Sequence, residues 1–170
     1  MIILTNTTAV QFEPSLVKQG VDIAINNLNR ASELVKTFKK VASDQHIEEL
    51  RRFSLADYLA NTVTSLEPKL KQQNVVIEWT CDESIILESY PGLLWQVFSN
   101  LVMNSLIHGY EHKEKGTINI QVEALSEWVK IVYRDDGCGM SDEVKSSIFL
   151  PFYTTKRHTG GTGLGMHIVY

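Results

Sequence analysis

Apolar residues recur with helical spacing along the first quarter of the chain. From about Pro14 to Ser43 they follow a heptad pattern, which predicts one long amphipathic helix. The a and d positions hold Val21, Ala24, Leu28, Ala31, Val35, Phe38 and Ala42. Further apolar residues widen this stripe, so the pattern favours a helix in a helical bundle, with packing against its own domain as the alternative. The polar stretch at 44–52 then predicts a linker.

Two more helices are predicted in the middle of the chain from their end signals. Ser54, followed three residues later by Asp57, resembles a capping box and predicts a helix to about Lys71. Pro91 suits a first helical turn and predicts a helix to about His108, with a glycine C-cap directly after it.

Short alternating runs predict four strands around these helices. Residues 75–79 and 85–88 are β-prone and predict a hairpin or strand pair. Residues 117–125 and 128–134 alternate most clearly and are joined by a short polar turn. A short helix capped by Ser141, a loop and a final helix complete the order. This order predicts an α+β fold, a two-layer sandwich with a mixed sheet and helices on one face.

Length and composition suit one globular domain with a helical extension. The chain has 170 residues, of which 44% are hydrophobic and 21% are charged. We divide it into a helix (1–45), a linker (46–53) and a domain (54–170). The net charge of −4 argues against a nucleic-acid binder. Cys81 and Cys138 have no disulfide or metal spacing, and no apolar run has the length of a membrane span.

Asn100, Asn104 and His108 recur every four residues, so they form a polar ridge on the third predicted helix. One interpretation is an exposed polar face. The other is a ligand site, because an amide oxygen can complete the octahedral shell of Mg²⁺ while phosphate oxygens supply the charge.

Two glycine-containing segments follow that ridge along the chain. Asp135–Met140 comes directly after a strand, where a carboxylate can accept a hydrogen bond from an adenine amino group; a tight turn with surface acids is the alternative. Gly160–Gly165 opens the last helix and can present backbone N–H groups to a phosphate; a flexible linker is the alternative.

An aromatic and basic segment, Phe149–Arg157, lies between the two glycine segments. It reads either as a surface loop anchored by aromatic side chains or as a lid. As a lid, it would bring Lys156 or Arg157 to a terminal phosphate.

Taken in order, these segments resemble the four conserved boxes of the GHKL ATPase superfamily, and within it those of the sensor histidine kinases. The N box corresponds to Asn100–His108, the G1 box to Asp135–Gly139, the F box to Phe149–Lys156 and the G2 box to Gly161–Gly165. The resemblance covers roughly Phe53 to Tyr170. The first helix resembles the second helix of the kinase dimerisation stem.

The resemblance implies ATP and Mg²⁺ as cofactors and assigns roles to individual residues. Asn104 would ligate Mg²⁺, and Asn100 would lie near the γ-phosphate and the incoming histidine. Asp135 would bind the adenine amino group, with Gly139 beneath the base. Asn100 and Lys156 would be the catalytic residues. The full ATP-binding set would be Asn100, Asn104, His108, Asp135, Gly137, Gly139, Met140, Lys156, Arg157, Thr162, Gly163, Leu164 and Gly165.

Two positions depart from relatives in informative ways. Ile107 stands where the family often has lysine, which leaves more of the charge compensation to Lys156 and Arg157. Asn100 stands where the chaperone and mismatch-repair ATPases usually have a glutamate base, so hydrolysis is the weaker interpretation. A GHKL-type ATPase and a nucleotide-gated interaction module remain the alternatives, followed by a serine-directed anti-sigma kinase.

None of the five histidines is followed by the acid and nearby proline typical of the family's phosphoacceptor. The acceptor helix is therefore expected before residue 1, and two more strands are expected after the last helix. The implied partners are a stem histidine of the same or the partner subunit and a response regulator receiver domain. The stem would form a homodimer, and no nucleic-acid partner is expected. The domain would be cytoplasmic, in a sensor that can be membrane-anchored.

Overall fold

The computed structural model describes residues 15, 17–25, 27–28, 32, 49–156 and 161–170. The chain divides into two compact units, residues 1–43 and 44–170. In the first unit the described residues are helical and exposed. The rest of that predicted helix, and most of the predicted linker, lie outside the described residues.

Helix α2 (Leu55–Gln72) begins where the capping signal predicted it. The Ser54 hydroxyl oxygen accepts a hydrogen bond of 3.2 Å from the backbone N–H of Asp57. One face of the helix is buried, at Leu55, Leu59, Leu66 and Leu70. These leucines recur at helical spacing, so burial of one face explains why this segment is a helix.

A two-stranded antiparallel sheet joins β1 (Arg51–Ser54) to β3 (Ile86–Ser89). Strand β1 corrects the predicted linker, 46–53, because the last residues of that stretch are extended and paired. The two arginines that begin β1 are exposed and made the segment look like a linker. Phe53 packs its ring 5.3 Å from that of Tyr58, which attaches the strand to α2.

A three-stranded mixed sheet consists of β2 (Val75–Thr80), β4 (Gly116–Ala124) and β5 (Val129–Asp135). The predicted hairpin between 117–125 and 128–134 is confirmed by the antiparallel pairing of β4 with β5. The predicted pairing of 75–79 with 85–88 is wrong, because β2 pairs in parallel with β4 and β3 pairs with β1. Parallel strands need a long crossover, which the chain between β2 and β4 provides.

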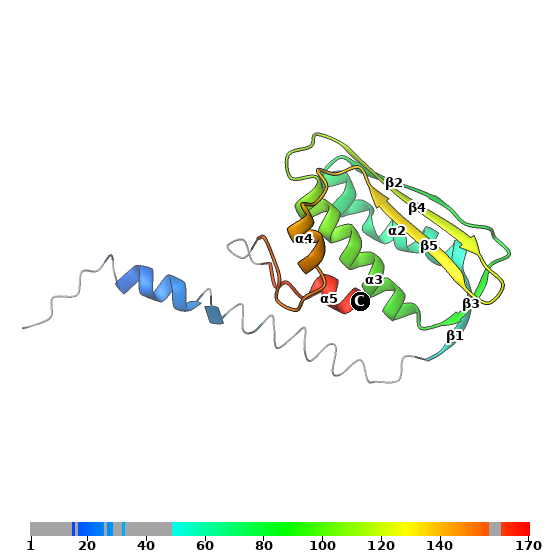
Figure 1. Ribbon diagram of the computed structural model, residues 1–170, viewed down its shortest axis with the longest axis horizontal. Coiled ribbons are helices and arrows are strands. Elements are labelled where there is room, and N and C mark those ends of the chain that lie inside the picture. Colours follow the sequence, from blue (N-terminus) through cyan, green and yellow to red (C-terminus); the bar gives the residue numbers. More distant parts are fainter. Residues whose placement is uncertain (1–14, 16, 26, 29–31, 33–48, 157–160) are drawn as a thin grey trace, which may run out of the picture. The chain divides into compact units, whose positions relative to one another are not determined.

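The core lies between the helices and the three-stranded sheet (Figure 1). Helix α3 (Pro91–Asn104) contributes Phe98 and Val102, and β4 contributes Ile118 and Ile120. Each of these four side chains is at most 2% exposed. The predicted α+β sandwich is confirmed, and α3, which carries the asparagine ridge, is anchored in the core.

The predicted α-helix to His108 with a Gly109 C-cap is wrong in its last turn. After Asn104 the chain continues as a π-helix, η1 (Ser105–Gly109), closed by a 3.0 Å hydrogen bond from Tyr110 N–H to the Ser105 carbonyl. Phe98, Val102, Leu106 and Tyr110 are all buried. Residues four apart drift by about 40° per step on an α-helix. A wider π turn offsets this drift and keeps the last two side chains in the core.

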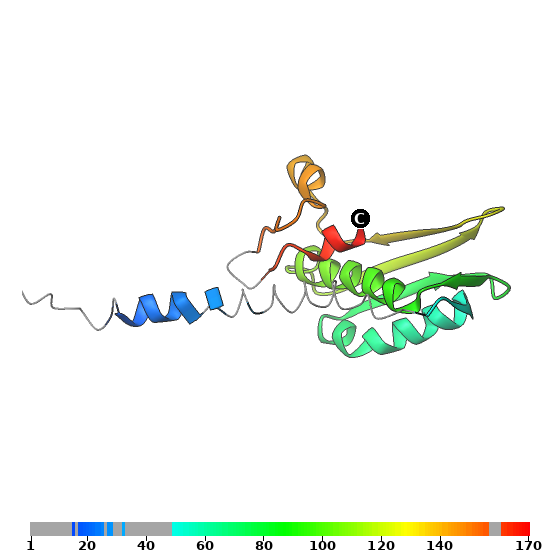
Figure 2. The ribbon, with the colours of Figure 1, turned by 90° about the horizontal axis from the view of Figure 1, so that it is seen from below.

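Two short helices carry the remaining segments. Helix α4 (Asp142–Ser147) is capped by Ser141, whose hydroxyl oxygen accepts a 3.3 Å bond from the Val144 N–H, as predicted. Helix α5 (Gly165–Val169) lies beside α3 (Figure 2). In the part of the chain that the structure describes, no helix has the length and apolar character needed to cross a bilayer.

Candidate nucleotide site

The predicted motif segments meet along the C-terminal half of α3 and η1. The amide of Asn100 donates a 3.0 Å hydrogen bond to the carbonyl of Gly165, at the start of α5. His108 Nδ1 lies 3.3 Å from the hydroxyl of Thr155. The backbone N–H of Cys138 donates to the carbonyl of Gly109 at 3.0 Å. Each of the three other segments therefore contacts the asparagine segment directly.

Asp135 ends β5 with its carboxylate held from two sides. Its Oδ1 accepts the backbone N–H of Gly137 at 3.0 Å, and its Oδ2 accepts the Ser105 hydroxyl at 2.9 Å. The Ser105 hydroxyl also lies 2.8 Å from the hydroxyl of Tyr133. Burial raises the pKa of Tyr133 above its ordinary value, so this phenol stays protonated. Asp135 itself is exposed and open to a ligand.

Gly137 is required by the close approach of two segments. A Cβ at this position would lie 2.7 Å from Asp135 Oδ1 and 2.7 Å from the Cα of Gly109. Gly139 has a φ of +73°, in the left-handed region that glycine adopts readily. Met140 follows with half of its surface exposed. The turn can therefore bring backbone and a flexible apolar side chain close to a flat ligand.

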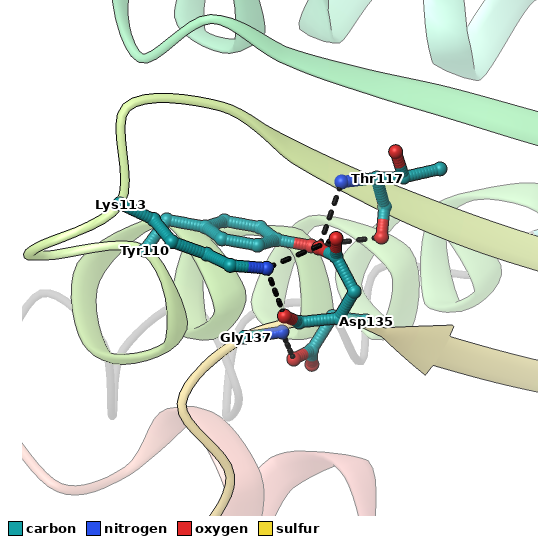
Figure 3. A network of polar contacts seen from close by, with 6 residues as sticks. Tyr110, Lys113, Thr117, Asp135 and Gly137 are labelled. Atoms are coloured by element: carbon teal, nitrogen blue, oxygen red, sulfur yellow. Dashed lines mark hydrogen bonds and ion pairs between the residues drawn. The ribbon is translucent and has the colours of Figure 1, made fainter.

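Asp136, beside Asp135, ties the turn to β4 and to the loop after η1. Figure 3 shows Tyr110, Lys113 and Thr117 next to Asp135 in this network. Its Oδ1 accepts the backbone N–H of Thr117 at 2.8 Å, and its Oδ2 lies 3.0 Å from Lys113 Nζ. These two donors, the backbone N–H first, lower the pKa of Asp136 to about 2. The hydroxyl of Tyr110 donates to the Thr117 carbonyl at 2.9 Å. The network fixes the backbone that presents Asp135.

Asn104 carries a polar atom whose bonding is incomplete. Its Nδ2 is buried and has no hydrogen-bond partner among the described residues. Amide oxygen and nitrogen atoms can be exchanged by a half-turn of the side chain, so the unbonded position can hold the amide oxygen instead. A buried polar group without a partner is costly, and a ligand that supplies one removes the cost. This observation fits a ligand at Asn104.

Lys156 forms an ion pair with Glu111. Its Nζ lies 2.5 Å from Glu111 Oε1, and its side chain is 21% exposed. Lys156 lowers the pKa of Glu111 through this contact. Burial, and then the Lys156 charge, lower the pKa of His108, which therefore carries a neutral ring near pH 7. Arg157, the other predicted phosphate-binding cation, lies outside the described residues.

The last glycine loop packs against the aromatic segment before it. A Cβ on Gly163, whose φ is +68°, would lie 2.5 Å from the Phe152 carbonyl carbon. Phe152 itself has a φ of +64°, a conformation that is rare for a bulky residue and is found mostly where function requires it. The Thr162 hydroxyl accepts the Leu164 N–H at 3.4 Å. Thr162, Gly163 and Leu164 thus lead into Gly165, beside Asn100.

The sequence interpretation did not include Ser105, Glu111 and Thr155, which contact the predicted site residues Asp135, Lys156 and His108. It also did not include Tyr133, which bonds to Ser105. Ser105 had a visible signal, because it is a hydroxyl residue on the apolar face next to Asn104. Glu111 had none, since its contact with Lys156 depends on how two distant segments fold together.

The chain is similar to known ATPases and sensor histidine kinases. Residues 90–170 match the family described as histidine kinase-, DNA gyrase B- and HSP90-like ATPases. The catalytic domain of histidine kinase ThkA has 30% identity and a TM-score of 0.60, over 71% of this chain and 76% of that one. Sensor histidine kinase ZraS of Salmonella typhimurium is 27% identical over 143 residues, covering 83% of this chain and 30% of ZraS. Anti-sigma F factor of Clostridium botulinum is 39% identical over 71 residues, which cover 42% of this chain and 48% of that factor.

The fold and the order of the four motifs define a catalytic ATPase domain of the histidine kinase type. The chain belongs to the family of histidine kinase-, DNA gyrase B- and HSP90-like ATPases. The chain spans 30% of the length of ZraS.

Proposed function

We propose that the domain binds Mg²⁺-ATP and transfers the γ-phosphoryl group to a histidine on a helical stem. The observation that carries this proposal is the convergence of Asn100, the Asp135 carboxylate and the Gly163 loop on one helix, α3 with η1. The match to sensor histidine kinases supports the same chemistry.

Adenine recognition rests on Asp135. A carboxylate has about four acceptor sites, and the protein fills one on each oxygen. The remaining sites accept the adenine amino group and a water molecule. Gly137 and Gly139 leave room for the base against the backbone, and Met140 lies at its edge.

The phosphates and the metal lie at the opposite end of the proposed nucleotide. Asn104 gives Mg²⁺ one neutral ligand, and phosphate oxygens supply the negative charge. The backbone N–H groups of 162–165 hold phosphates. On nucleotide binding, Lys156 would leave its ion pair with Glu111 and bind the terminal phosphate, and Arg157 would add a second cation. Asn100 orients the acceptor.

Such a transfer depends mostly on positioning and on charge stabilisation. The domain therefore needs no nucleophile of its own. Its proposed partners are a stem histidine of the same or a second subunit, a homodimeric stem and a response regulator. The structure of histidine kinase ThkA with the response regulator protein TrrA supports the last of these. The domain would act in the cytoplasm, as part of a sensor that can be anchored in a membrane.

One other candidate is favoured by a specific observation. The 39% identity to an anti-sigma F factor over 71 residues supports transfer to a serine instead of a histidine. The amide at Asn100, in place of a glutamate base, argues against water as the acceptor. Acceptor chemistry therefore separates the two kinase proposals.

The nucleotide assignment is tested by binding of a non-hydrolysable ATP analogue to Asp135→Asn. Replacing one acceptor oxygen by a donor removes a hydrogen bond to a charged group, worth about 1.5–3 kcal/mol, so affinity should fall by about 10- to 100-fold. Calorimetry measures the change. Asp142→Asn is the matched control, because that carboxylate is fully exposed on α4 and should leave affinity unchanged. Equal affinities for both variants would remove the adenine assignment.

A further inference from the structure

A pair of hydroxyl groups, from buried Ser105 and partly buried Tyr133, lies next to the carboxylate of Asp135. Ser105 is 4% exposed, and its hydroxyl lies between Tyr133 OH at 2.8 Å and Asp135 Oδ2 at 2.9 Å. Buried polar pairs of this kind fix one arrangement when every member has a partner. The Ser105 hydroxyl contacts Asp135, the residue proposed to bind adenine. The Tyr133 hydroxyl contacts Ser105 and acts on Asp135 only through it.

Proton counting fixes the direction of this pair. An ionised carboxylate can only accept, so Ser105 must spend its single hydroxyl hydrogen on Asp135. The Tyr133 hydroxyl then has to donate to Ser105. The chain of donors therefore runs from Tyr133 to Ser105 to Asp135 Oδ2. Burial raises the pKa of Tyr133, which keeps the first donor protonated at every physiological pH.

The second oxygen of Asp135 is fixed independently. Oδ1 accepts the Gly137 N–H at 3.0 Å, so the carboxylate plane is set by one donor on each oxygen. Without the Ser105 bond, one contact would remain and the carboxylate could rotate about it. The unused acceptor sites of the Asp135 carboxylate would then no longer be held in one orientation.

We propose that Ser105, supported by Tyr133, is a positioning residue that orients the Asp135 carboxylate for the amino group of adenine and so sets the preference for adenine. This inference rests on the proposed nucleotide function and deepens it. An oriented pair of acceptors favours a base that donates from its 6-position. It disfavours guanine, which has a carbonyl oxygen there and would face acceptor against acceptor.

The test compares ATP with purine riboside triphosphate, which lacks the 6-amino group, in wild type and Ser105→Ala. We expect ATP affinity to fall by about fivefold, because a charge-assisted bond is weakened but not removed. The affinity for the analogue should change by less than about twofold, since it makes no bond to Asp135. A merely structural role would weaken both ligands equally, and that outcome would overturn the proposal.

Tyr133→Phe tests the relay separately. Ser105 keeps its bond to Asp135 in this variant, so the loss for ATP should be about twofold. The double variant Ser105→Ala/Tyr133→Phe should bind ATP as Ser105→Ala does, because Tyr133 acts only through Ser105. It also leaves no buried hydroxyl without a partner, which protects folding if Ser105→Ala alone is unstable. Additive losses would contradict the relay.

Ser99→Ala is the matched control for removing a serine hydroxyl from the same helix. The Ser99 hydroxyl donates to the Gln96 carbonyl at 3.1 Å, and the change should leave both affinities as in wild type. The outcomes separate the two levels of inference. If the wild-type protein binds neither ATP nor the analogue, the nucleotide function fails. If it prefers ATP and Ser105→Ala keeps the full preference, only the role of Ser105 fails.

Discussion

Asn104 differs from its neighbours in the site in the bonding of its side-chain amide nitrogen. Asn100 is bonded to Gly165, and Asp135 is bonded on both oxygens. The buried amide nitrogen of Asn104 has no partner in the described part of the chain. An unmet buried polar group costs about 1–3 kcal/mol, so the position is unfavourable for stability alone. The proposed role as a Mg²⁺ ligand would explain why an amide stands there.

Asn104→Ala should therefore separate binding from folding. We expect the affinity for an ATP analogue to lose its dependence on Mg²⁺, because one metal ligand is removed. Stability should not fall, since the substitution also removes an unmet polar group. Calorimetry with Mg²⁺ and with a chelator, alongside thermal unfolding, measures both effects.

Asn61→Ala is the control for the loss of an asparagine side chain from a helix, because Asn61 is exposed on α2. It should keep the full Mg²⁺ effect. If Asn104→Ala also keeps that effect, the metal is held elsewhere and Asn104 must be given another role.

Lys156 shows why single residues in the site were only partly predictable. Its basic character and its place before the glycine loop were visible in the sequence. Its ion pair with Glu111 and the contact of Thr155 with His108 depend on the folded path of the segment. Because Glu111 is 46% exposed, a phosphate can replace it without leaving a fully buried charge. Without that phosphate, the ion pair with Glu111 holds Lys156 where its charge acts on His108.

At the scale of elements, end signals and periodicity were sufficient for most helices and strands. The Ser54 and Ser141 caps lie where predicted, and β4 and β5 form the predicted hairpin. Strand partners were harder to predict. Alternation shows which side chains of β2 point inward, but the same pattern is compatible with pairing to β3 or to β4. In the structure β2 pairs with β4, and β3, α3 and η1 form the crossover between these two strands.

The π-helix η1 was a different kind of miss. Burial of Phe98, Val102, Leu106 and Tyr110 at intervals of four is readable from the sequence, yet a polar ridge with the same interval suggested a regular α-helix. On α geometry both stripes would drift by about 40° per step, and the apolar stripe would leave the core over this length. The wider turn resolves the conflict and places Ser105 under Asp135.

The contact between the last glycine loop and the aromatic segment gives an element-scale prediction. Gly163→Ala would combine positive φ with a Cβ 2.5 Å from the Phe152 carbonyl carbon, so the loop must shift relative to Phe152. We expect affinity for the ATP analogue to fall more than about tenfold, because oriented N–H groups are lost. Calorimetry measures the loss.

Gly20→Ala is the control for a glycine substitution outside the site. A Cβ there would meet nothing within 4 Å, and affinity should not change. Gly139→Ala gives a second comparison, for stability only. It carries the same kind of strain as Gly163→Ala, of about 1 kcal/mol, but meets no nearby atom. A Gly163→Ala protein no less stable than Gly139→Ala would mean that the loop does not depend on its contact with Phe152.

At the scale of the whole molecule, the order of motifs predicted more than any motif did alone. Each segment had an ordinary alternative, but four of them in one order indicated the family, and the fold agrees. The reason is that the fold brings segments far apart in the chain to one helix, so their chemistry depends on all of them. What the sequence could not supply were the contacts across segments, such as Ser105 with Tyr133.

The residue that accepts the phosphoryl group can be tested with the whole protein. Mixed with Mg²⁺-ATP and a helical stem protein that carries a histidine followed by an acid and a proline, the chain should transfer phosphate to that stem. The product should be labile in acid and stable in base, as a phosphoramidate is. The protein by itself should incorporate no label, because its five histidines lack this context.

Two controls make the outcome decisive. Asp135→Asn should reduce transfer in proportion to its loss of nucleotide affinity, and a stem with its histidine replaced by glutamine should take up no label. An acid-stable product on a serine would favour the anti-sigma type of kinase. Steady phosphate release without any acceptor would favour a hydrolase instead. An amide cannot act as the base that activates water. Hydrolysis would therefore mean that another group activates the water, and that Asn100 does not decide which acceptor is used.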